Sequence, residues 1–322
     1  MEINHLQELV RNDFDAVNEL IYTKIKSKVD LISNLANHLI QSGGKRIRPL
    51  LVLLTSNACN YKGNDHITLA AMVEFFHTAT LLHDDVIDES TLRRGKETAN
   101  EIWGSKASIL VGDYLLTLYM QLMINVGNLD IMTLLSDTGH KITCGEIQQL
   151  GNRNNPDITL DEYYEVISAK TSLLFAASAA LGGMISKSPK NITDSLYAYG
   201  LHLGNAFQII DDSLDYCSDA KTIGKNIGDD LADGKATLPL IFALKHGTAN
   251  QKLMIRESIT QGKIETFPEI IEAIRETKAI EYTQKIASSE IDKAILALQV
   301  LPESVYKEAL TKLANFAINR KH

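Results

Sequence analysis

Apolar residues recur at a spacing near 3.6 over long stretches of the chain, and this spacing predicts helices rather than strands. Only 6 prolines occur in 322 residues, and glycine-containing breaks such as Gly127-Asn128 separate the helical stretches. Thr159 and Glu162 have the spacing of a capping box ahead of a helical run that reaches Ala180. The pattern therefore predicts an all-α protein.

No low-complexity linker divides these helical stretches, although the length alone allows one large domain or two ordinary ones. Two acidic motifs, described below, fall in different halves of the chain. Because we expect one centre to need both motifs, the sequence predicts a single domain over residues 1–322.

The charge balance argues against several classes of partner. Lys and Arg number 32 against 40 Asp and Glu, a net charge of −8, and no long basic run offers a nucleic-acid footprint. Cys59, Cys144 and Cys217 are widely spaced, which predicts reduced thiols that fill the core of a cytoplasmic protein. The acidic N-terminus is unlike a signal peptide. The run from Leu173 to Ile185 is shorter than the ~20 residues of a membrane span, so we expect no stable membrane insertion.

The stretch from Leu81 to Gly95, LLHDDVIDESTLRRG, concentrates charge directly behind an apolar run. On a helix, Asp84 and Asp88 would lie one turn apart, about 6 Å along the axis. Because these like charges repel, we expect a cation between them, and oxygen ligands without Cys or His favour Mg²⁺. The same spacing returns in a second motif, which we expect to form the facing wall of one site: Asp211, Asp212 and Asp215.

An acidic helix end is usually a solvated face, so the first motif has an ordinary alternative. The preceding segment is apolar on most sides, which instead predicts a buried helix whose carboxylates need partners. Arg93 and Arg94 follow the motif. They could pair internally with Asp88 and Glu89, or bind a phosphate with their forked guanidinium groups.

A second basic stretch, GGKRIRP from Gly43 to Pro49, predicts a glycine-led turn into a helix. An ordinary helix start is the alternative. Cations at a helix N-terminus are unfavourable, whereas an anion gains there from the backbone donors and the dipole, so a bound diphosphate would resolve the conflict. Lys170 and Thr171 interrupt an otherwise apolar helix, where the lysine could also extend to solvent.

With both DDxxD motifs, GGKRIRP, the following RRG, the Lys-Thr pair, FQIIDD and GKNIGDDLADGKATLPL in this order, the chain resembles the trans-polyprenyl diphosphate synthases. Among them it resembles the bacterial members that form octaprenyl diphosphate. The motifs cover about Gln41 to Leu240. The resemblance implies an all-α isoprenoid synthase fold, a bundle of roughly antiparallel helices around a deep central cavity, and a homodimer.

The resemblance also implies roles for single residues. About three Mg²⁺ ions would be held against the allylic diphosphate by Asp84, Asp88, Asp211 and Asp215, with Asp85 and Asp212 in support. The allylic diphosphate itself would contact Arg93, Lys170, Thr171, Gln208, Lys225 and Lys235. Isopentenyl diphosphate would be held by Lys45, Arg48, His77 and Arg94, although His77 has an alternative as an ordinary core histidine. Glu146 and Gln149 match a GExxQ pattern of the family, or else form a polar stripe on a surface helix.

The implied reaction is condensation of an allylic diphosphate, such as farnesyl diphosphate, with successive isopentenyl diphosphates. Residues beside the first motif imply the product length: Ala79 and Thr80 are small where short-chain enzymes carry aromatics, and Phe76 would line the tunnel without closing it. We therefore expect a C40 product for quinone side chains, with geranylgeranyl or nonaprenyl products as alternatives. A terpene cyclase and a head-to-head coupling enzyme are further alternatives, and GGKRIRP disfavours the cyclase, which needs no second diphosphate pocket. A non-catalytic partner subunit is disfavoured by the six intact aspartates.

Overall fold

The computed structural model describes residues 3–41, 44–217, 228–262 and 264–319. The chain divides into two compact units. Unit 1 comprises Met1–Asp137, Leu174–Gly200 and Ala297–Leu313, and unit 2 comprises Thr138–Leu173, Leu201–Leu296 and Ala314–His322. Three of the five boundaries fall inside helices α8 (Leu129–Gly151), α11 (Lys190–Leu214) and α18 (Val305–Ile318), and the other two fall one residue from an end of α10 (Leu173–Ile185) and α17 (Ala279–Ala297). The single domain over 1–322 stays a prediction.

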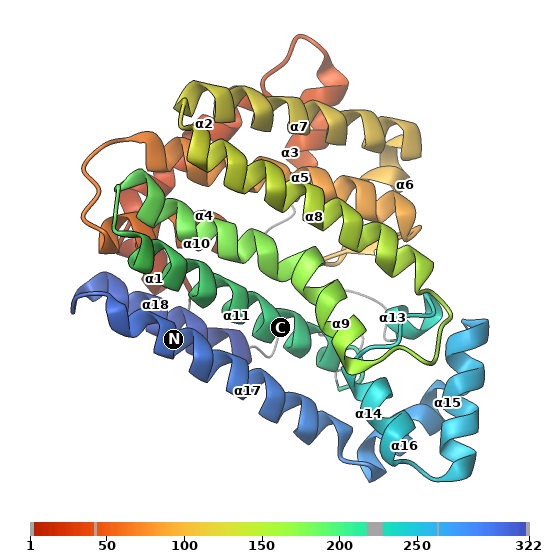
Figure 1. Ribbon diagram of the computed structural model, residues 1–322. Helices are drawn as coiled ribbons and strands as arrows, with labels where there is room; N and C mark the ends of the chain where they lie inside the picture. The colour runs from red at the N-terminus through yellow and green to blue at the C-terminus, as the bar shows by residue number, and fades with distance from the viewer. Residues whose placement is uncertain (1–2, 42–43, 218–227, 263, 320–322) are drawn as a thin grey trace. The chain divides into compact units, whose positions relative to one another are not determined.

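Unit 1 is built on α5 (Asp65–Ile87), which packs against α2 (Arg11–Ile25), α4 (Ile47–Ala58) and α7 (Ser105–Val126) (Figure 1). The sequence of α5 is apolar on most sides, and its middle is accordingly buried from Leu69 to Val73. The other helices that contribute to this unit are α1 (Ile3–Glu8), α3 (Asp30–Gln41), α6 (Ala99–Trp103) and α10 (Leu173–Ile185).

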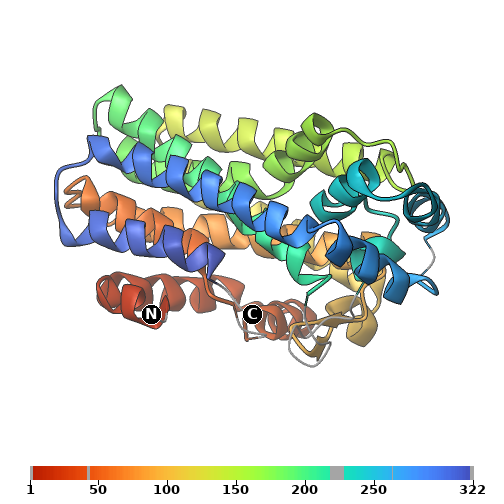
Figure 2. The same ribbon diagram turned by 90° about the horizontal axis from the view of Figure 1, so that it is seen from below.

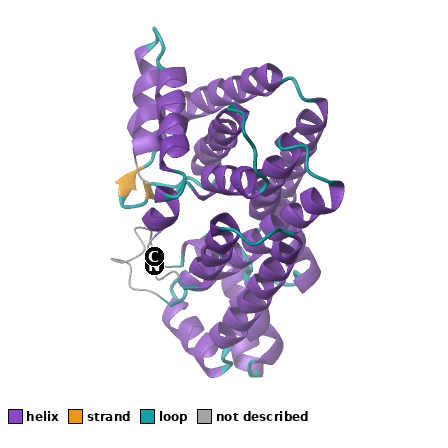
Figure 3. Cartoon of the chain, turned by 90° about the vertical axis from the view of Figure 1, so that its left-hand side faces the viewer, coloured by secondary structure: helices purple, strands orange, loops and turns teal. Residues whose placement is uncertain are grey.

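A short antiparallel ribbon follows α5 and is the one β-sheet within the described ranges (Figure 3). Strand β1 (Leu92–Arg93) pairs with β2 (Lys96–Glu97), and Arg93 lies opposite Lys96. The two turn residues, Arg94 and Gly95, have φ of 54° and 74°, the left-handed conformation that a two-residue hairpin turn needs. The all-α prediction is otherwise confirmed.

In unit 2, α9 (Leu160–Ile167) begins with the predicted capping box: Thr159 accepts from the Glu162 amide, and the Glu162 side chain accepts from the Thr159 amide. A π-helical turn, Ser168–Ser172, links α9 to α10. Helices α14 (Leu238–His246), α15 (Ala249–Gln261) and α16 (Phe267–Glu276) share one apolar cluster (Figures 1 and 2). The unit also contains α13 (Asp229–Ala232) and α17 (Ala279–Ala297), and the 3₁₀ turn Leu298–Val300 follows α17.

Two features bear on the predicted compartment. Cys59, Cys144 and Cys217 are all free thiols, but Cys144 and Cys217 are exposed, so the prediction that they fill the core was wrong for these two. Two helical stretches, Ser105–Val126 and Leu160–Ile185, are long and apolar enough to cross a membrane. The apolar part of the second is 72% buried in the protein, and core helices of soluble proteins pass the same test.

Candidate active site

The first acidic motif lies at the C-terminal end of α5. Asp84 occupies the last turn, and Asp88 is the C-cap, with its backbone N–H donating to the Asp84 carbonyl at 2.8 Å. The helix therefore ends within the motif instead of continuing through it. Asp84 and Asp88 remain one turn apart, as the spacing predicts.

The middle aspartate of this motif is buried. Asp85 is 1% exposed and is bound by Arg93, whose Nε lies 2.8 Å and whose Nη2 lies 2.6 Å from Oδ1. The ribbon after α5 brings Arg93 back toward the helix. Because such charge-assisted, forked pairs fix orientation, Asp85 sets the position of the Arg93 guanidinium.

Arg48 lies in a cationic region of unit 1. Its guanidinium carbon is 4.6 Å from the centre of the Phe175 ring, and its Nε is buried without a hydrogen-bond partner among the described residues. Burial, with a smaller effect from nearby Arg94, lowers the pKa of Arg48 to about 10 although Glu74 opposes the shift. A buried donor without an acceptor is costly, so this position favours an anionic ligand.

His77 lies near the same arginines. Burial holds the pKa of His77 well below its usual range, and the charges of Arg48, Arg94 and Arg93 lower it further. The imidazole is therefore neutral at pH 7, with one nitrogen that donates and one that accepts. The charges that lower its pKa come from two separate sequence motifs, Arg48 from GGKRIRP and Arg93 and Arg94 from RRG, so the structure brings these predicted residues together.

Glu74, one turn before His77, was missed by the sequence analysis. Burial raises the pKa of Glu74 even though Arg46, Arg48 and Arg94 act in the opposite direction. The available signal was a single acidic residue in the apolar run of α5. Its charge opposes those of the arginines near it, which partly offsets the cost of holding several cations close together.

The turn before α4 contacts this cationic region through its backbone. A Cβ on Gly44 would lie 2.7 Å from Arg94 Nη1, so the glycine makes room for the arginine. The Lys45 carbonyl accepts from Gln7 Nε2 at 3.2 Å. Arg46 is the N-cap of α4, its backbone φ is 44°, and its guanidinium donates to Asn18. The predicted turn into a helix is confirmed.

In unit 2, Lys170 lies in the π-helical turn and does not extend freely to solvent. Its Nζ is 3.0 Å from Glu146 Oε2 and 3.0 Å from Gln149 Oε1. The two residues of the GExxQ pattern therefore bind the lysine, and their role in the family's pattern stays a prediction. Gly145 allows the close approach, because a Cβ there would lie 2.2 Å from Ala169 Cβ.

Thr171, Gln208, Asp212 and Tyr163 form a chain of hydrogen bonds. Thr171 Oγ1 donates to Gln208 Oε1 at 2.7 Å, and Gln208 Nε2 donates to Asp212 Oδ1 at 2.8 Å. Tyr163 Oη donates to Asp212 Oδ2 at 2.6 Å. Burial, and then the charge of Asp230, raises the pKa of Asp212 to about 8. Tyr163 carried no sequence signal, because it reads as an ordinary core aromatic.

The second motif also lies at a helix end. Asp211 is exposed, α11 ends at Leu214, and Asp215 follows directly. Asp215 accepts from the Gly228 amide at 3.2 Å and the Asp230 amide at 3.3 Å. Burial, followed by the charges of Asp230 and Asp229, raises the pKa of Asp215 to about 7. Carboxylates here crowd one another.

The two remaining predicted cations have different outcomes. Lys235 Nζ pairs with Asp233 at 2.7 Å and is largely buried. Lys225 lies outside the described residues. Both stay predictions as contacts to the allylic diphosphate.

Among the residues that the structure describes, no three side chains of His, Cys, Asp or Glu converge closely enough to form a metal site by themselves. The donors nevertheless suit a hard divalent cation, because they are carboxylate oxygens. Burial, and next the charge of Asp230, raises the pKa values of Asp212 and Asp215, and a bound cation would offset both effects.

The residues predicted to control product length lie along α5. Ala79 is fully buried, and Thr80 Oγ1 donates to the His77 carbonyl at 2.9 Å. The Phe76 ring lies 5.1 Å from the ring of Tyr119 on α7. Tyr119 is a second aromatic beside the predicted tunnel position that the sequence analysis missed.

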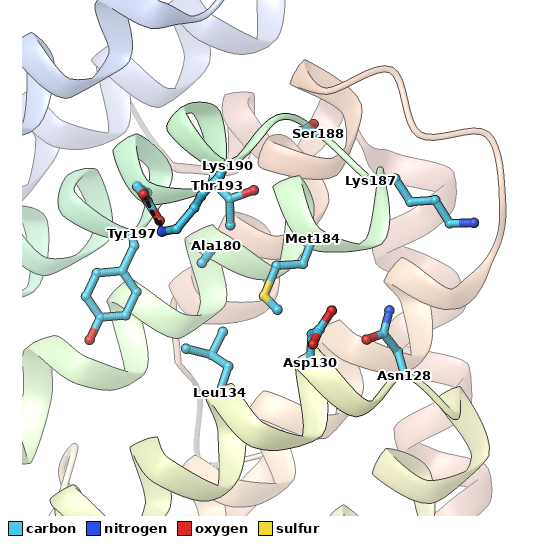
Figure 4. Close-up of a pocket in the computed structure, with 11 residues that line it drawn as sticks. Asn128, Asp130, Leu134, Ala180, Met184, Lys187, Ser188, Lys190, Thr193 and Tyr197 are labelled. Carbon is cyan, nitrogen blue, oxygen red and sulfur yellow. Dashed lines mark hydrogen bonds and ion pairs between the residues drawn. The ribbon is translucent and has the colours of Figure 1, made fainter.

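A cavity of about 680 Å³ opens in unit 1 near the start of α8, the end of α10 and the start of α11 (Figure 4). Leu134, Ala180 and Met184 give it an apolar part. Its charged residues balance, because it has two lysines and two aspartates, and Lys190 pairs with Asp194 at 2.7 Å. None of the predicted site residues lines it, and its balanced charge does not favour a diphosphate.

Helices that end in carboxylates, together with arginines that gather near one histidine, are typical of a class of helical enzymes that handle diphosphates through metal ions. A family model, polyprenyl synthetase, matches residues 29–274. The chain belongs to this family. It is a prenyltransferase of the polyprenyl diphosphate synthase class, as the motifs predicted.

Individual relatives match over nearly the full length. An octaprenyl diphosphate synthase of Escherichia coli (strain K12) is 46% identical over 321 residues, which cover 99% of each chain. An all-trans-nonaprenyl-diphosphate synthase (geranyl-diphosphate specific) of Rhodobacter capsulatus is 41% identical, again over 99% of each. A polyprenyl synthase from Caulobacter crescentus CB15, solved in complex with calcium and isoprenyl diphosphate, has a TM-score of 0.96 at 38% identity and covers 100% of this chain and 98% of its own. The isoprenoid synthase fold is therefore confirmed.

Proposed function

We propose that the enzyme condenses farnesyl diphosphate with successive isopentenyl diphosphates and releases a long all-trans polyprenyl diphosphate. The observation that carries this proposal is the cationic region of unit 1, where buried Arg48 has an unpaired Nε near Arg94 and a neutral His77. A diphosphate supplies acceptor oxygens for these donors.

Each substrate has its own set of residues in this proposal. Lys45, Arg48, His77 and Arg94 hold the diphosphate of isopentenyl diphosphate. The allylic diphosphate is held by Arg93, Lys170, Thr171, Gln208, Lys225 and Lys235. For the first set, the support is the shared electrostatic surroundings of Arg48, His77 and Arg94. For the second, it is the network that fixes Lys170 and Thr171.

The metal in the proposal is Mg²⁺, about three ions per active site, held in unit 1 by Asp84 and Asp88 and in unit 2 by Asp211 and Asp215. When bound, it supplies positive charge against the departing diphosphate. The carboxylate donors support this assignment, as does the calcium bound to the Caulobacter relative.

The chain's own residues then act on charge and position. Lys170 and Arg93 stabilise the negative charge that develops on the allylic diphosphate as its C–O bond breaks. Lys170 is held by Glu146 and Arg93 by Asp85, so these two cations need little movement to reach the diphosphate. The neutral imidazole of His77 donates one hydrogen bond to the second diphosphate. The buried apolar surface of α5 limits water near the carbocation.

The product we propose is octaprenyl diphosphate (C40), a precursor of a quinone side chain. The fully buried, small Ala79 and the identity of 46% with an octaprenyl diphosphate synthase support it. Chromatography of the products formed from farnesyl and isopentenyl diphosphates tests it, and we expect a C40 main product from the purified chain with Mg²⁺. An endpoint at C15 or C20 contradicts the length. No diphosphate release at all contradicts the reaction.

Ala79→Tyr tests the position of the growing tail. The added ring should obstruct the tunnel and shorten the main product. The matched control is Ala70→Tyr, since Ala70 is equally buried on α5 but lies nine residues away, 2.5 turns, and so on the opposite face. Both variants should lose stability, and only the first should shorten the product. Equal product lengths in the two would remove Ala79 from the tunnel.

We also propose a cytoplasmic homodimer that contacts a second copy through α7. Leu110, Met120 and Ile124 of α7 are 68%, 53% and 64% exposed and fall on one face of the helix. An exposed apolar stripe of this kind favours a protein partner. Leu110→Glu should shift the protein toward monomer in sedimentation velocity, whereas a wild-type monomer would contradict the interface.

A further inference from the structure

The turn Ser168–Ser172 is π-helical, and such turns are rare and frequently lie at functional sites. It carries Lys170 and Thr171. Two neighbouring helices approach it closely through glycines: a Cβ on Gly145 of α8 would lie 2.2 Å from Ala169 Cβ, and one on Gly204 of α11 would lie 2.5 Å from Ser172 Cα. Something must hold the wider turn in place.

Asn205, next to Gly204 on α11, binds both ends of this turn. Its Oδ1 accepts from Ser172 Oγ at 2.6 Å and from Ser168 Oγ at 3.2 Å. Asn205 is 6% exposed, so these bonds are shielded from water. One oxygen therefore joins the first and last residues of the turn.

Glu290 of α17 fixes which way the Asn205 amide points. Its Oε2 accepts from Asn205 Nδ2 at 3.0 Å and from His202 Nδ1 at 2.8 Å, and its Oε1 accepts from Lys293 Nζ at 2.6 Å. Because an ionised carboxylate only accepts, it must face the amide nitrogen. The amide oxygen is then directed to the two serines.

We propose that Asn205 and Glu290 are positioning residues for the allylic diphosphate. Glu290 orients Asn205, Asn205 holds the π-helical turn, and the turn sets where Lys170 Nζ and Thr171 Oγ1 lie. This inference rests on the proposed function, in which Lys170 and Thr171 contact that substrate. Neither Asn205 nor Glu290 touches it.

Asn205→Ala separates positioning from simple stability. It should raise the KM for farnesyl diphosphate and lower kcat, together a loss of about 10- to 100-fold in kcat/KM, because small displacements of positioned groups are costly. The KM for isopentenyl diphosphate should not change. Amide hydrogen exchange of the Ser168–Ser172 segment should become faster. The matched control is Ser258→Ala in α15 of the same unit, which removes a buried hydroxyl that is hydrogen-bonded to Thr266, the N-cap of α16.

A swap of donor and acceptor tests the link to Glu290. Asn205→Asp alone places two carboxylates together and should be worse than Asn205→Ala. Adding Glu290→Gln supplies an amide that donates to the new carboxylate, so the double variant should recover part of the KM for farnesyl diphosphate.

The outcomes are distinct. If Asn205→Ala lowers the melting temperature as Ser258→Ala does but leaves the KM for farnesyl diphosphate unchanged, the positioning role is overturned and a structural role remains. If the double variant recovers nothing, Glu290 does not act through Asn205. A wild-type enzyme that forms no polyprenyl product overturns the proposed function, and the hydrogen-exchange comparison still decides whether Asn205 holds the turn.

Discussion

The two acidic motifs share one spacing but have opposite surroundings. In each, the middle aspartate is buried and the last one lies just beyond the final turn of a long helix. Asp85 is neutralised by Arg93 through a two-pronged pair. Among the described residues, the hydrogen-bond partners of Asp212 are the neutral donors Tyr163 and Gln208, and its pKa is raised to about 8. The two motifs therefore share their position at a helix end but differ in the charge of the partners of their middle aspartates.

We infer from this difference that the surroundings of the two motifs suit different ligands. Around the first motif, the charge of Arg94 lowers the pKa of Arg48 and the charge of Arg93 lowers that of Arg94, so cations lie near one another where they suit diphosphate oxygens. Around the second, Asp215 is crowded by Asp229 and Asp230, which suits cations. Exchanging the two motifs would therefore not be neutral, although their letters are nearly the same.

The largest expected effect comes from the outer aspartates, which we treat as equivalent metal ligands despite their surroundings. Asp84→Asn and Asp211→Asn should each lower kcat by about 10²- to 10³-fold, because each removes charge that stabilises the departing diphosphate. Steady-state kinetics with a Mg²⁺ titration measures this, and the Mg²⁺ concentration for half-maximal activity should rise in both. Unchanged thermal unfolding is the control. If only one of the two variants is impaired, the motifs are not equivalent as ligands.

The middle aspartates should separate in stability. Asp85→Asn leaves Arg93 without its counter-charge and should cost about 3 kcal/mol in the free energy of unfolding. Asp212→Asn should cost about 1 kcal/mol or less, since an amide can accept from Gln208 and donate to Tyr163. Urea unfolding monitored by circular dichroism measures both. Equal losses would mean that burial, and not the partner, determines how these residues contribute.

Sequence alone predicted the features of these motifs that depend on residues close together in the chain. The spacing of Asp84 and Asp88 predicts a shared helix face, and Thr159 with Glu162 predicts a helix start, because both depend on neighbours within one turn. The motif order was enough to predict the family and the fold. The arginines near His77 also followed from the motifs, through the resemblance.

Partners distant in sequence could not be predicted. Tyr163 reaches Asp212 across 49 positions, and Asn205 reaches Glu290 across 85. Each of these residues has an ordinary role when considered alone, as a core aromatic or a polar position on a helix. The π-helical turn was equally hidden, because the apolar spacing of α9 and α10 continues across it and predicts one regular helix.

Acid should destabilise unit 2 through Glu290, a buried carboxylate that accepts hydrogen bonds from His202, Asn205 and Lys293. Burial alone would raise its pKa, but bonds from His202, Lys293 and Asn205 lower it from 4.5 to about 2. A depressed folded-state pKa stabilises the protein above the unfolded value, and this contribution is lost as the pH falls from 4.5 toward 2. Between pH 5 and pH 3 the loss should be about 2 kcal/mol. Urea midpoints at several pH values measure it, and Glu290→Gln should flatten that part of the profile. A wild-type profile as flat as that of the variant would contradict the depressed pKa.

The smallest expected effects test whether the two regions serve different substrates. Arg48→Gln in unit 1 should raise the KM for isopentenyl diphosphate about tenfold, the loss of one charge-assisted contact of roughly 1.5 kcal/mol. Lys170→Gln in unit 2 should do the same for farnesyl diphosphate. Each variant serves as the control for the other, because both remove one cation from a partly buried position. Initial rates with one substrate varied and the other saturating give the four KM values. If Arg48→Gln raises the KM for both substrates equally, the arginines of unit 1 act as a general field on diphosphates and not as the site of one of them.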